Sequence, residues 1–291
     1  MSEFAALRPY VTNLERPVFA LRNLPEEVVA VLFAYYSRST DSLRDNLRKL
    51  IEAGDLALTS SPSEEPEAAL AAAKDKARQF HEKWVVGYGH GSVAEHAVVH
   101  LAIEEISIVA TKALEDNRLA SYTEKSTRYV PFDADSFVRD PQIAASPEAA
   151  LYDRTCRHLL GTYTRLMPTV IEQVSARFAR PAEWPERRYQ SVCRAKAFDL
   201  LRYLLPAATR TNVGLTINGR ALEHLLTKLY SHPLGELREL AGALHREAEQ
   251  IVPTLIKYAA RNEYQVNTTA LQAQRAAELL PSPDAAPQAN G

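Results

Sequence analysis

The chain is 291 residues long and 46% of its residues are hydrophobic, which is enough for one large or two modest globular domains. This composition excludes an intrinsically disordered protein. The 34 Lys and Arg residues nearly balance the 36 Asp and Glu residues, and the resulting net charge of -2 gives no general attraction to nucleic-acid phosphates or anionic lipid. We therefore expect no sequence-independent nucleic-acid binding and no membrane association.

The only two cysteines, Cys156 and Cys193, lack the close Cys or His spacing of a zinc knuckle or a redox pair. We predict that both are reduced thiols and that the protein is cytoplasmic. Glu3, Arg8 and Glu15 interrupt the N-terminal region where a signal peptide needs an unbroken apolar stretch. No later run approaches the ~20 apolar residues of a membrane span, so a soluble protein is expected.

The spacing of apolar residues predicts mostly helices. A helix pair is expected at 24–51, then a mobile loop at 58–66 and an Ala-rich helix at 67–84. Residues 97–106 predict a strand, because Val99, Leu101 and Ile103 alternate with other side chains. Ser107 is expected to cap a helix that ends near Asp116. Four more helices are predicted at 147–178, 187–205, 218–229 and 234–260.

The segment GYGHGSVAEHAVVH, residues 87–100, is rich in Gly and His. Ser92 and Glu95 have the spacing of a capping box, whose free backbone N–H groups could receive an anion, although such a box alone more often only caps a helix. His96 and His100 would share one face of a helix as zinc ligands. No third ligand is evident and His100 is expected on a strand, so we predict no metal site.

A second polar segment, NRLASYTEKSTRYVPF, covers residues 117–132. Its hydroxyls, backbone N–H groups and arginine are the groups that grip a phosphomonoester. Composition alone predicts an ordinary exposed loop here.

The order of the short motifs along the chain resembles that of a known protein family. Arg118 is followed by seven residues, then by Ser126 and the pair Arg128-Tyr129, and GHGSVAEH stands upstream. This pattern resembles the flavin-dependent thymidylate synthase (ThyX) family, whose hallmark is Arg-His-Arg, seven residues, Ser and then Arg-Tyr. Three downstream segments echo that family in the same order, and the likeness covers roughly half the chain: RYLLP at 202–206, NGRALEHLL at 218–226 and SHPLGELRELA at 231–241.

The resemblance implies an α/β fold, a helix-rich α+β arrangement with a small central sheet flanked by long helices. It implies a homotetramer that binds FAD and dUMP side by side at subunit interfaces. Methylenetetrahydrofolate would supply carbon and NADPH would reduce the flavin, giving reductive methylation of dUMP to dTMP. One domain would span 1–280, with an N-terminal helical extension to about 85, a divergent helical middle at about 133–195 and a disordered tail at 281–291.

The resemblance also assigns site residues, which we carry over position by position. Neighbouring subunits would share each site. Arg202 would come from a neighbouring chain, and Asn218, Arg220 and His224 would come from another subunit. The cofactor-binding residues would be His90, Ser92, Arg118, Asn218, Arg220 and His224. The substrate-binding residues would be Glu124, Ser126, Thr127, Arg128 and Arg202.

Two departures from the family stand out. Asp116-Asn117 replaces the Arg-His of the hallmark, and an acid near the flavin would oppose negative charge on the reduced ring. Where the family places an arginine that promotes uracil ionisation, this chain offers only Lys228, which we name as the candidate catalytic residue. These changes leave two alternatives open: a flavin or nucleotide enzyme with an altered substrate, and a catalytically silent assembly subunit.

Overall fold

The computed structural model describes residues 4–37, 39–52 and 91–280. The expected loop at 58–66, the expected helix at 67–84, His90 and the predicted tail lie outside these residues. The described elements are η1 Ala5–Leu7, α1 Glu26–Tyr36, α2 Leu43–Glu52, η3 Gly91–His96, β1 Val98–Ser107, α4 Ile108–Glu115, β2 Ala120–Glu124, α5 Pro141–Ala144, α6 Ala149–Arg177, α7 Glu186–Leu201, η4 Arg202–Leu204, β3 Arg210–Asn218, α8 Gly219–Tyr230, α9 Gly235–Ala248 and α10 Glu263–Leu279.

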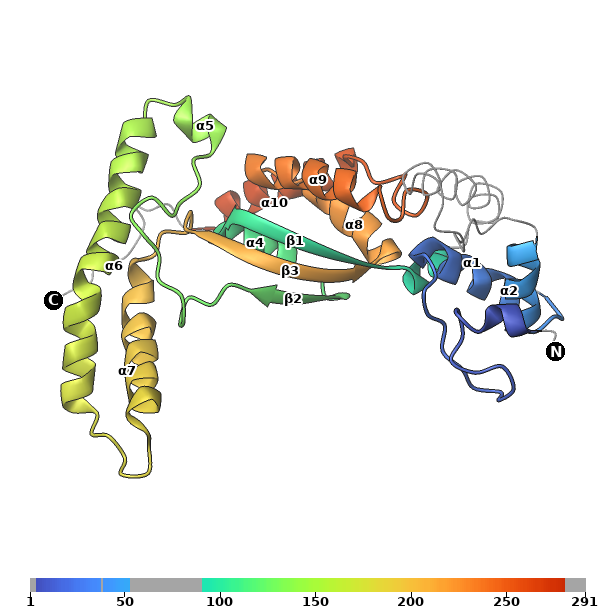
Figure 1. Cartoon of the computed structure of the whole chain (residues 1–291). Helices are drawn as coiled ribbons and strands as arrows, with labels where there is room; N and C mark the ends of the chain where they lie inside the picture. Colours follow the sequence, from blue (N-terminus) through green and yellow to red (C-terminus); the bar gives the residue numbers. More distant parts are fainter. Residues whose placement is uncertain (1–3, 38, 53–90, 281–291) are drawn as a thin grey trace, which may run out of the picture.

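A three-stranded antiparallel sheet in the order β1-β3-β2 forms the centre (Figure 1). The predicted strand is confirmed to within one residue as β1. The register shifts between Ile103 and Ile106, and Glu105 within this bulge has a φ of 58°. Such an extra residue bends a strand and strengthens its twist.

The central strand β3 was not predicted, although its sequence carries the signal. Val213, Leu215 and Ile217 are buried and alternate with more exposed residues along RTNVGLTIN. The expectation that 117–132 is a polar loop was also wrong in part, because residues 120–124 form β2. Ala120–Glu124 is only five residues long, and pairing with β3 stabilises it more than its own sequence pattern does.

Helices cover one face of the sheet. The buried side chains of β1 and β3 pack with those of α4, α8 and α9 into the largest apolar cluster, and Figure 1 shows α8 and α9 along one side of the strands. Ser107 caps α4 as predicted, with its Oγ 3.1 Å from the backbone N of Ala110. The other face carries small and polar side chains, among them His100, Thr216, Ser121 and Thr123.

Helices α6 and α7 form a long antiparallel hairpin that projects from one end of the sheet (Figure 1). Both helices were predicted from sequence, but α7 ends at Leu201 and a 3-10 turn, η4, follows it. The hairpin has an apolar cluster of its own around Phe137, Leu160, Tyr163 and Phe198. Cys156 and Cys193 are buried in this hairpin as free thiols, as expected.

Helices α1 and α2 lie near the opposite end of the sheet, where the predicted helix pair is confirmed (Figure 1). Two carboxylates at the start of α1 join this pair to the rest of the molecule. Glu26 Oε2 accepts a hydrogen bond from the backbone N of Val98 at 2.8 Å, and buried Glu27 accepts from the N and Oγ1 of Thr254. The N-terminal region is therefore tied to both β1 and the segment that follows α9.

The C-terminal part differs from the prediction. The expected helix at 234–260 ends at Ala248, and α10, Glu263–Leu279, was not predicted. The fold class is confirmed as helix-rich α+β with a small sheet flanked by helices. Among the residues that the structure describes, no helix has the length and apolar character that a membrane crossing requires.

Candidate functional site

The first group of predicted site residues surrounds the start of α8. We call it the α8 group: Ser92, Arg118, Asn218, Arg220 and His224. Asn218 is the N-cap residue, and its Oδ1 accepts a hydrogen bond from the backbone N of Ala221 at 2.9 Å. The side chains of Arg220 and His224 lie one turn apart on α8 and are exposed. The folding of β3 directly into α8 therefore fixes three of the five residues.

Ser92 joins this group through η3, which packs against α8. The sequence predicts a capping box at Ser92 and Glu95, but the segment is a 3-10 helix that leads into β1 and no α-helix begins here. Glu95 Oε1 instead accepts a hydrogen bond from Arg220 Nη1 at 2.6 Å. A Cβ on Gly219 would lie 3.1 Å from the carbonyl oxygen of Ala94, so a side chain at this position would push η3 and α8 apart.

Arg118 reaches the same region from the turn between α4 and β2. Its neighbour Asn117 donates a hydrogen bond from Nδ2 to the carbonyl oxygen of Ala221 at 3.3 Å, which holds the turn against the first turn of α8. The guanidinium of Arg118 is exposed. The turn thus adds a second arginine to the α8 group.

The two departures from the family meet in space. Lys228 Nζ donates a hydrogen bond to Asp116 Oδ2, and the two side chains form an ion pair. Lys228 is about one third exposed and Asp116 is largely exposed. The hydrogen bond from Lys228 holds the pKa of Asp116 below its usual value. The acid in place of the hallmark arginine is therefore the counter-ion of the candidate catalytic lysine.

The second group of predicted site residues lies at the end of β2, in the turn after it and, for Arg202, at the start of η4. We call it the arginine group: Glu124, Ser126, Thr127, Arg128 and Arg202. The turn is closed by hydrogen bonds to Ser126, whose Oγ accepts from the backbone N of Arg128 at 3.2 Å. The carbonyl oxygen of Ser126 accepts a hydrogen bond from the backbone N of Val130, also at 3.2 Å. This compact turn directs Arg128 toward the end of α7.

Arg128 and Arg202 of the same chain converge on one carboxylate, Asp199 of α7. The Nε and Nη2 atoms of Arg128 donate to Asp199 Oδ2 at 3.2 and 3.0 Å. Arg202 Nη1 lies 3.6 Å from Asp199 Oδ1. Sequence reasoning missed Asp199, although a carboxylate three residues before Arg202 on a helix is a recognisable signal for an ion pair. The resemblance predicts that Arg202 comes from a neighbouring chain, whereas here Arg202 and Arg128 of one chain meet at Asp199.

Glu124 of the arginine group faces α4. Its Oε1 lies 3.5 Å from the hydroxyl of Thr111. Burial, together with the negative charge of Glu124, raises the pKa of Glu115 on the same helix. The carboxylates of Glu115 and Glu124 therefore lie near each other at this corner of the sheet. Their charges favour hydrogen-bond donors as neighbours over further negative charge.

The α8 group and the arginine group lie at opposite ends of β2 within one chain (Figure 1). Ala120 pairs with Ile217 next to the start of α8, whereas Glu124 pairs with Val213 near the hairpin. Ala120–Glu124 spans five residues, so the ends lie roughly 13 Å apart. The two groups of predicted site residues are therefore separate in one chain and are joined by one strand.

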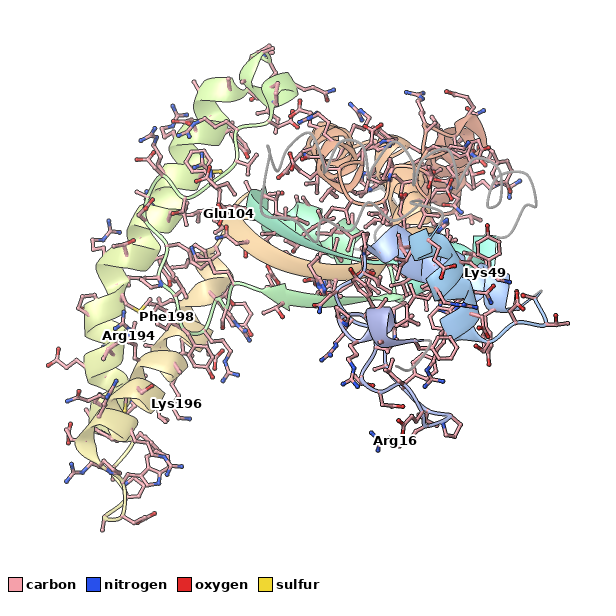
Figure 2. All side chains as sticks on the ribbon, turned by 45° about the vertical axis from the view of Figure 1, so that its right-hand side comes forward. Arg16, Lys49, Glu104, Arg194, Lys196 and Phe198 are labelled. Carbon is pink, nitrogen blue, oxygen red and sulfur yellow. The ribbon has the colours of Figure 1, made fainter. Side chains whose placement is uncertain are left out.

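The structure also shows the surroundings of the two histidines that were considered as zinc ligands, His96 and His100, and of Arg194. His96 stacks on Phe33 with ring centroids 4.6 Å apart, and His100 Nδ1 lies 2.9 Å from Thr216 Oγ1 on the exposed sheet face. Within residues 4–37, 39–52 and 91–280 there is no group of three His, Cys, Asp or Glu side chains that could hold a metal ion. The guanidinium of Arg194 lies over the ring of Phe198 on α7 (Figure 2).

Comparison with known proteins identifies the family of the chain. Residues 40–254 match the family described as thymidylate synthase complementing protein. A UPF0159 protein of Chlamydia pneumoniae is 38% identical over 263 residues, which are 87% of this chain and 48% of that protein. A flavin-dependent thymidylate synthase of Thermococcus kodakarensis is 33% identical over 178 residues, 60% of this chain and 63% of that enzyme. The chain thus spans about half the length of the UPF0159 proteins it matches.

The fold is similar to that of a crystal structure of a UMP/dUMP methylase, PolB, from Streptomyces cacaoi bound with 5-Br dUMP. The TM-score is 0.50 at 16% identity, and the likeness covers 80% of this chain and 89% of that one. The family match covers residues 40–254, which is most of the chain. The chain therefore belongs to the thymidylate synthase complementing protein family, the family of the flavin-dependent thymidylate synthases (ThyX).

Proposed function

We propose that this chain acts as a flavin-dependent thymidylate synthase, which converts dUMP to dTMP with methylenetetrahydrofolate as carbon donor and NADPH as reductant. The observation that carries the proposal is the convergence of Arg128 and Arg202 at Asp199 in a member of this family. Two guanidinium groups that face one anion form a suitable site for a phosphomonoester.

The arginine group would bind the nucleotide. The guanidinium groups of Arg128 and Arg202 would hold the phosphate by bidentate hydrogen bonds, because their planar forks match its oxygens. The Ser126 and Thr127 backbone N–H groups would add donors, and the Glu124 carboxylate would accept hydrogen bonds from the nucleotide. The turn at Ser126 keeps these groups close to one another.

The α8 group fits FAD. Arg118 and Arg220 are exposed cations beside the N-terminal end of α8, where the helix dipole favours the negative charge of phosphate oxygens. The close approach of Gly219 to Ala94 leaves η3, and with it Ser92, packed against this turn. FAD, when bound, would carry reducing equivalents from NADPH to the transferred carbon. His90, which the resemblance adds to this group, lies outside the described residues.

We further propose that copies of the chain complete one another's sites, in a homotetramer. The support is the separation of the two groups, which lie at opposite ends of β2 in one chain. The arginine group of one copy next to the α8 group of another would bring the nucleotide and the flavin together.

Lys228 is the candidate catalytic residue, and its ion pair motivates the second candidate function. A lysine whose charge is offset by Asp116 is a weaker electrophilic partner for a uracil than a free arginine. An enzyme with an altered substrate, or a silent assembly subunit, would tolerate such a pair.

The absorbance spectrum of the freshly purified chain tests the proposal first. A bound flavin gives bands in the visible region, and dUMP should raise the thermal unfolding temperature. Release of tritium from dUMP labelled at uracil C5, with the folate donor and NADPH present, then tests turnover. Flavin binding without tritium release would favour the altered enzyme, and a colourless protein that dUMP does not stabilise would favour the assembly subunit.

A mixing experiment tests the shared sites. Arg128→Ala disables the arginine group, and Arg220→Ala disables the α8 group. If two copies form each site, a mixture of these variants contains some sites with both groups intact and regains part of the activity. No recovery after subunit exchange, confirmed by native mass spectrometry, would place the whole site in one chain.

A further inference from the structure

Asp199 is a carboxylate in the position that a phosphate would take. It lies between Arg128 and Arg202, and each of its two oxygens faces a different guanidinium. Arg128 uses its Nε and Nη2 atoms for this contact, which is one of the two edges through which a guanidinium binds an oxyanion in bidentate fashion. An external phosphate that used this edge of Arg128 and approached Arg202 from the same side would have to displace the Asp199 carboxylate.

Local structure makes Asp199 a poorly stabilised anion. It belongs to the last turn of α7, which ends at Leu201, and negative charge is unfavourable at the C-terminal end of a helix. Its Oδ1 is buried and has no hydrogen-bond partner among the described residues. The two arginines are thus the principal source of stabilisation for this carboxylate.

The side chains have room to exchange partners. Arg128 is 51% exposed, Arg202 is 41% exposed and Asp199 is 30% exposed. A dianionic phosphate offers more charge and more acceptor oxygens than one carboxylate, so it would bind both arginines more strongly. It would also be repelled by Asp199 if that side chain stayed between them.

We propose that Asp199 is a specificity-determining residue that acts as an internal competitor for the phosphate of the nucleotide. It holds the two arginines together before the nucleotide binds and is displaced by a phosphomonoester. An uncharged nucleoside gains nothing from this displacement. This inference rests on the proposed function for the identity of the nucleotide, but its mechanism applies to any phosphomonoester.

The test compares Asp199→Asn with the wild-type full chain by isothermal titration with three probes: dUMP, deoxyuridine and inorganic phosphate. Asparagine has the same shape but lacks the charge that competes with phosphate. Removal of the competitor raises the fraction of free arginine pairs, so we expect dUMP and inorganic phosphate to bind about fivefold tighter or more. Deoxyuridine affinity should not change.

Asp153→Asn is the matched control, since Asp153 on α6 also bridges two arginines, Arg139 and Arg157. It should bind all three probes as the wild type does. Weaker or unchanged dUMP and phosphate binding in Asp199→Asn would overturn the inference, and so would the absence of phosphate binding in both proteins. If Asp199→Asn binds phosphate more tightly but the protein binds no flavin and shows no turnover, the competitor role of Asp199 is supported and the proposed function fails. If the asparagine variant does not fold, Asp199→Ser serves in its place.

Discussion

Lys228 and Asp116 form an ion pair across 112 residues of sequence. Asp116 stands where the ThyX hallmark has an arginine, and Lys228 stands where the family places a different arginine, so the charges of the two replacement residues neutralise each other. Because the pair joins α8 to the turn after α4, it also holds that turn close to the α8 group. The hydrogen bond from Lys228 is the main cause of the lowered pKa of Asp116, so the carboxylate is ionised and paired at neutral pH.

Lys228→Ala should lower kcat for dTMP formation by tenfold or more if its charge promotes uracil ionisation, as the loss of one electrostatic contact in a site typically does. Lys228→Arg should keep most of the activity. Asp116→Asn should raise kcat by a small factor, because it releases the lysine from its counter-ion. Thermal unfolding at neutral pH should hardly change in any of these variants, since exposed ion pairs add little stability. Equal kcat in all four proteins would remove Lys228 from the chemistry.

Arg128→Ala should weaken dUMP binding by about 2 kcal/mol, or roughly 30-fold, because a charged hydrogen-bond donor is lost. Isothermal titration measures this effect. Arg139→Ala is the control, because Arg139 also pairs with aspartates but lies outside the arginine group. Unchanged dUMP affinity in Arg128→Ala would exclude the arginine from the nucleotide site.

Glu115→Gln should stabilise the protein, and the gain should depend on pH. Burial and the charge of Glu124 raise the pKa of Glu115 above 4.5 in the folded state. Below pH 4.5 this carboxyl is protonated in both states. As pH rises through the folded pKa, ionisation favours the unfolded state and stability is lost. The variant should therefore unfold a few degrees higher than the wild type at pH 7 and at the same temperature at pH 4.

Glu104→Gln is the matched control for that measurement, because Glu104 is an exposed carboxylate on β1 (Figure 2). Its unfolding temperature should stay at the wild-type value at pH 7. A difference between Glu115→Gln and wild type that is equal at both pH values would show that packing, and not charge, causes the effect.

Ser107→Ala should lower the free energy of unfolding by about 2 kcal/mol, since it removes an N-cap and leaves a carboxylate short of a donor. Ser107 Oγ accepts from the backbone N of Ala110 and donates to Glu236 Oε2 at 2.6 Å. Urea denaturation measures the change, and Ser121→Ala on the exposed sheet face should stay within 0.5 kcal/mol of the wild type, as is typical of surface positions. Equal losses in both variants would mean that the cap contributes nothing specific.

The sequence alone determined the features that depend on neighbours along the chain. Alternation over a few residues identified β1, and hydroxyl placement identified the cap at Ser107. These two features were predictable because each depends on periodicity or on hydrogen bonds within a few residues. The family was identified by resemblance to its motif, and the family match agrees with that resemblance. The strand β3 was missed even though its alternation was visible, and β2 is too short for its own pattern to identify it.

Only the tertiary structure decided which distant residues meet. The pairing of β2 with β3 placed the α8 group and the arginine group at opposite ends of one strand. The packing of the hairpin brought Asp199 to Arg128 across 71 residues, and α8 brought Lys228 to Asp116. Such contacts are set by how elements pack around the shared apolar cores, and the free energy of that packing is a property of the whole fold and not of any local sequence pattern.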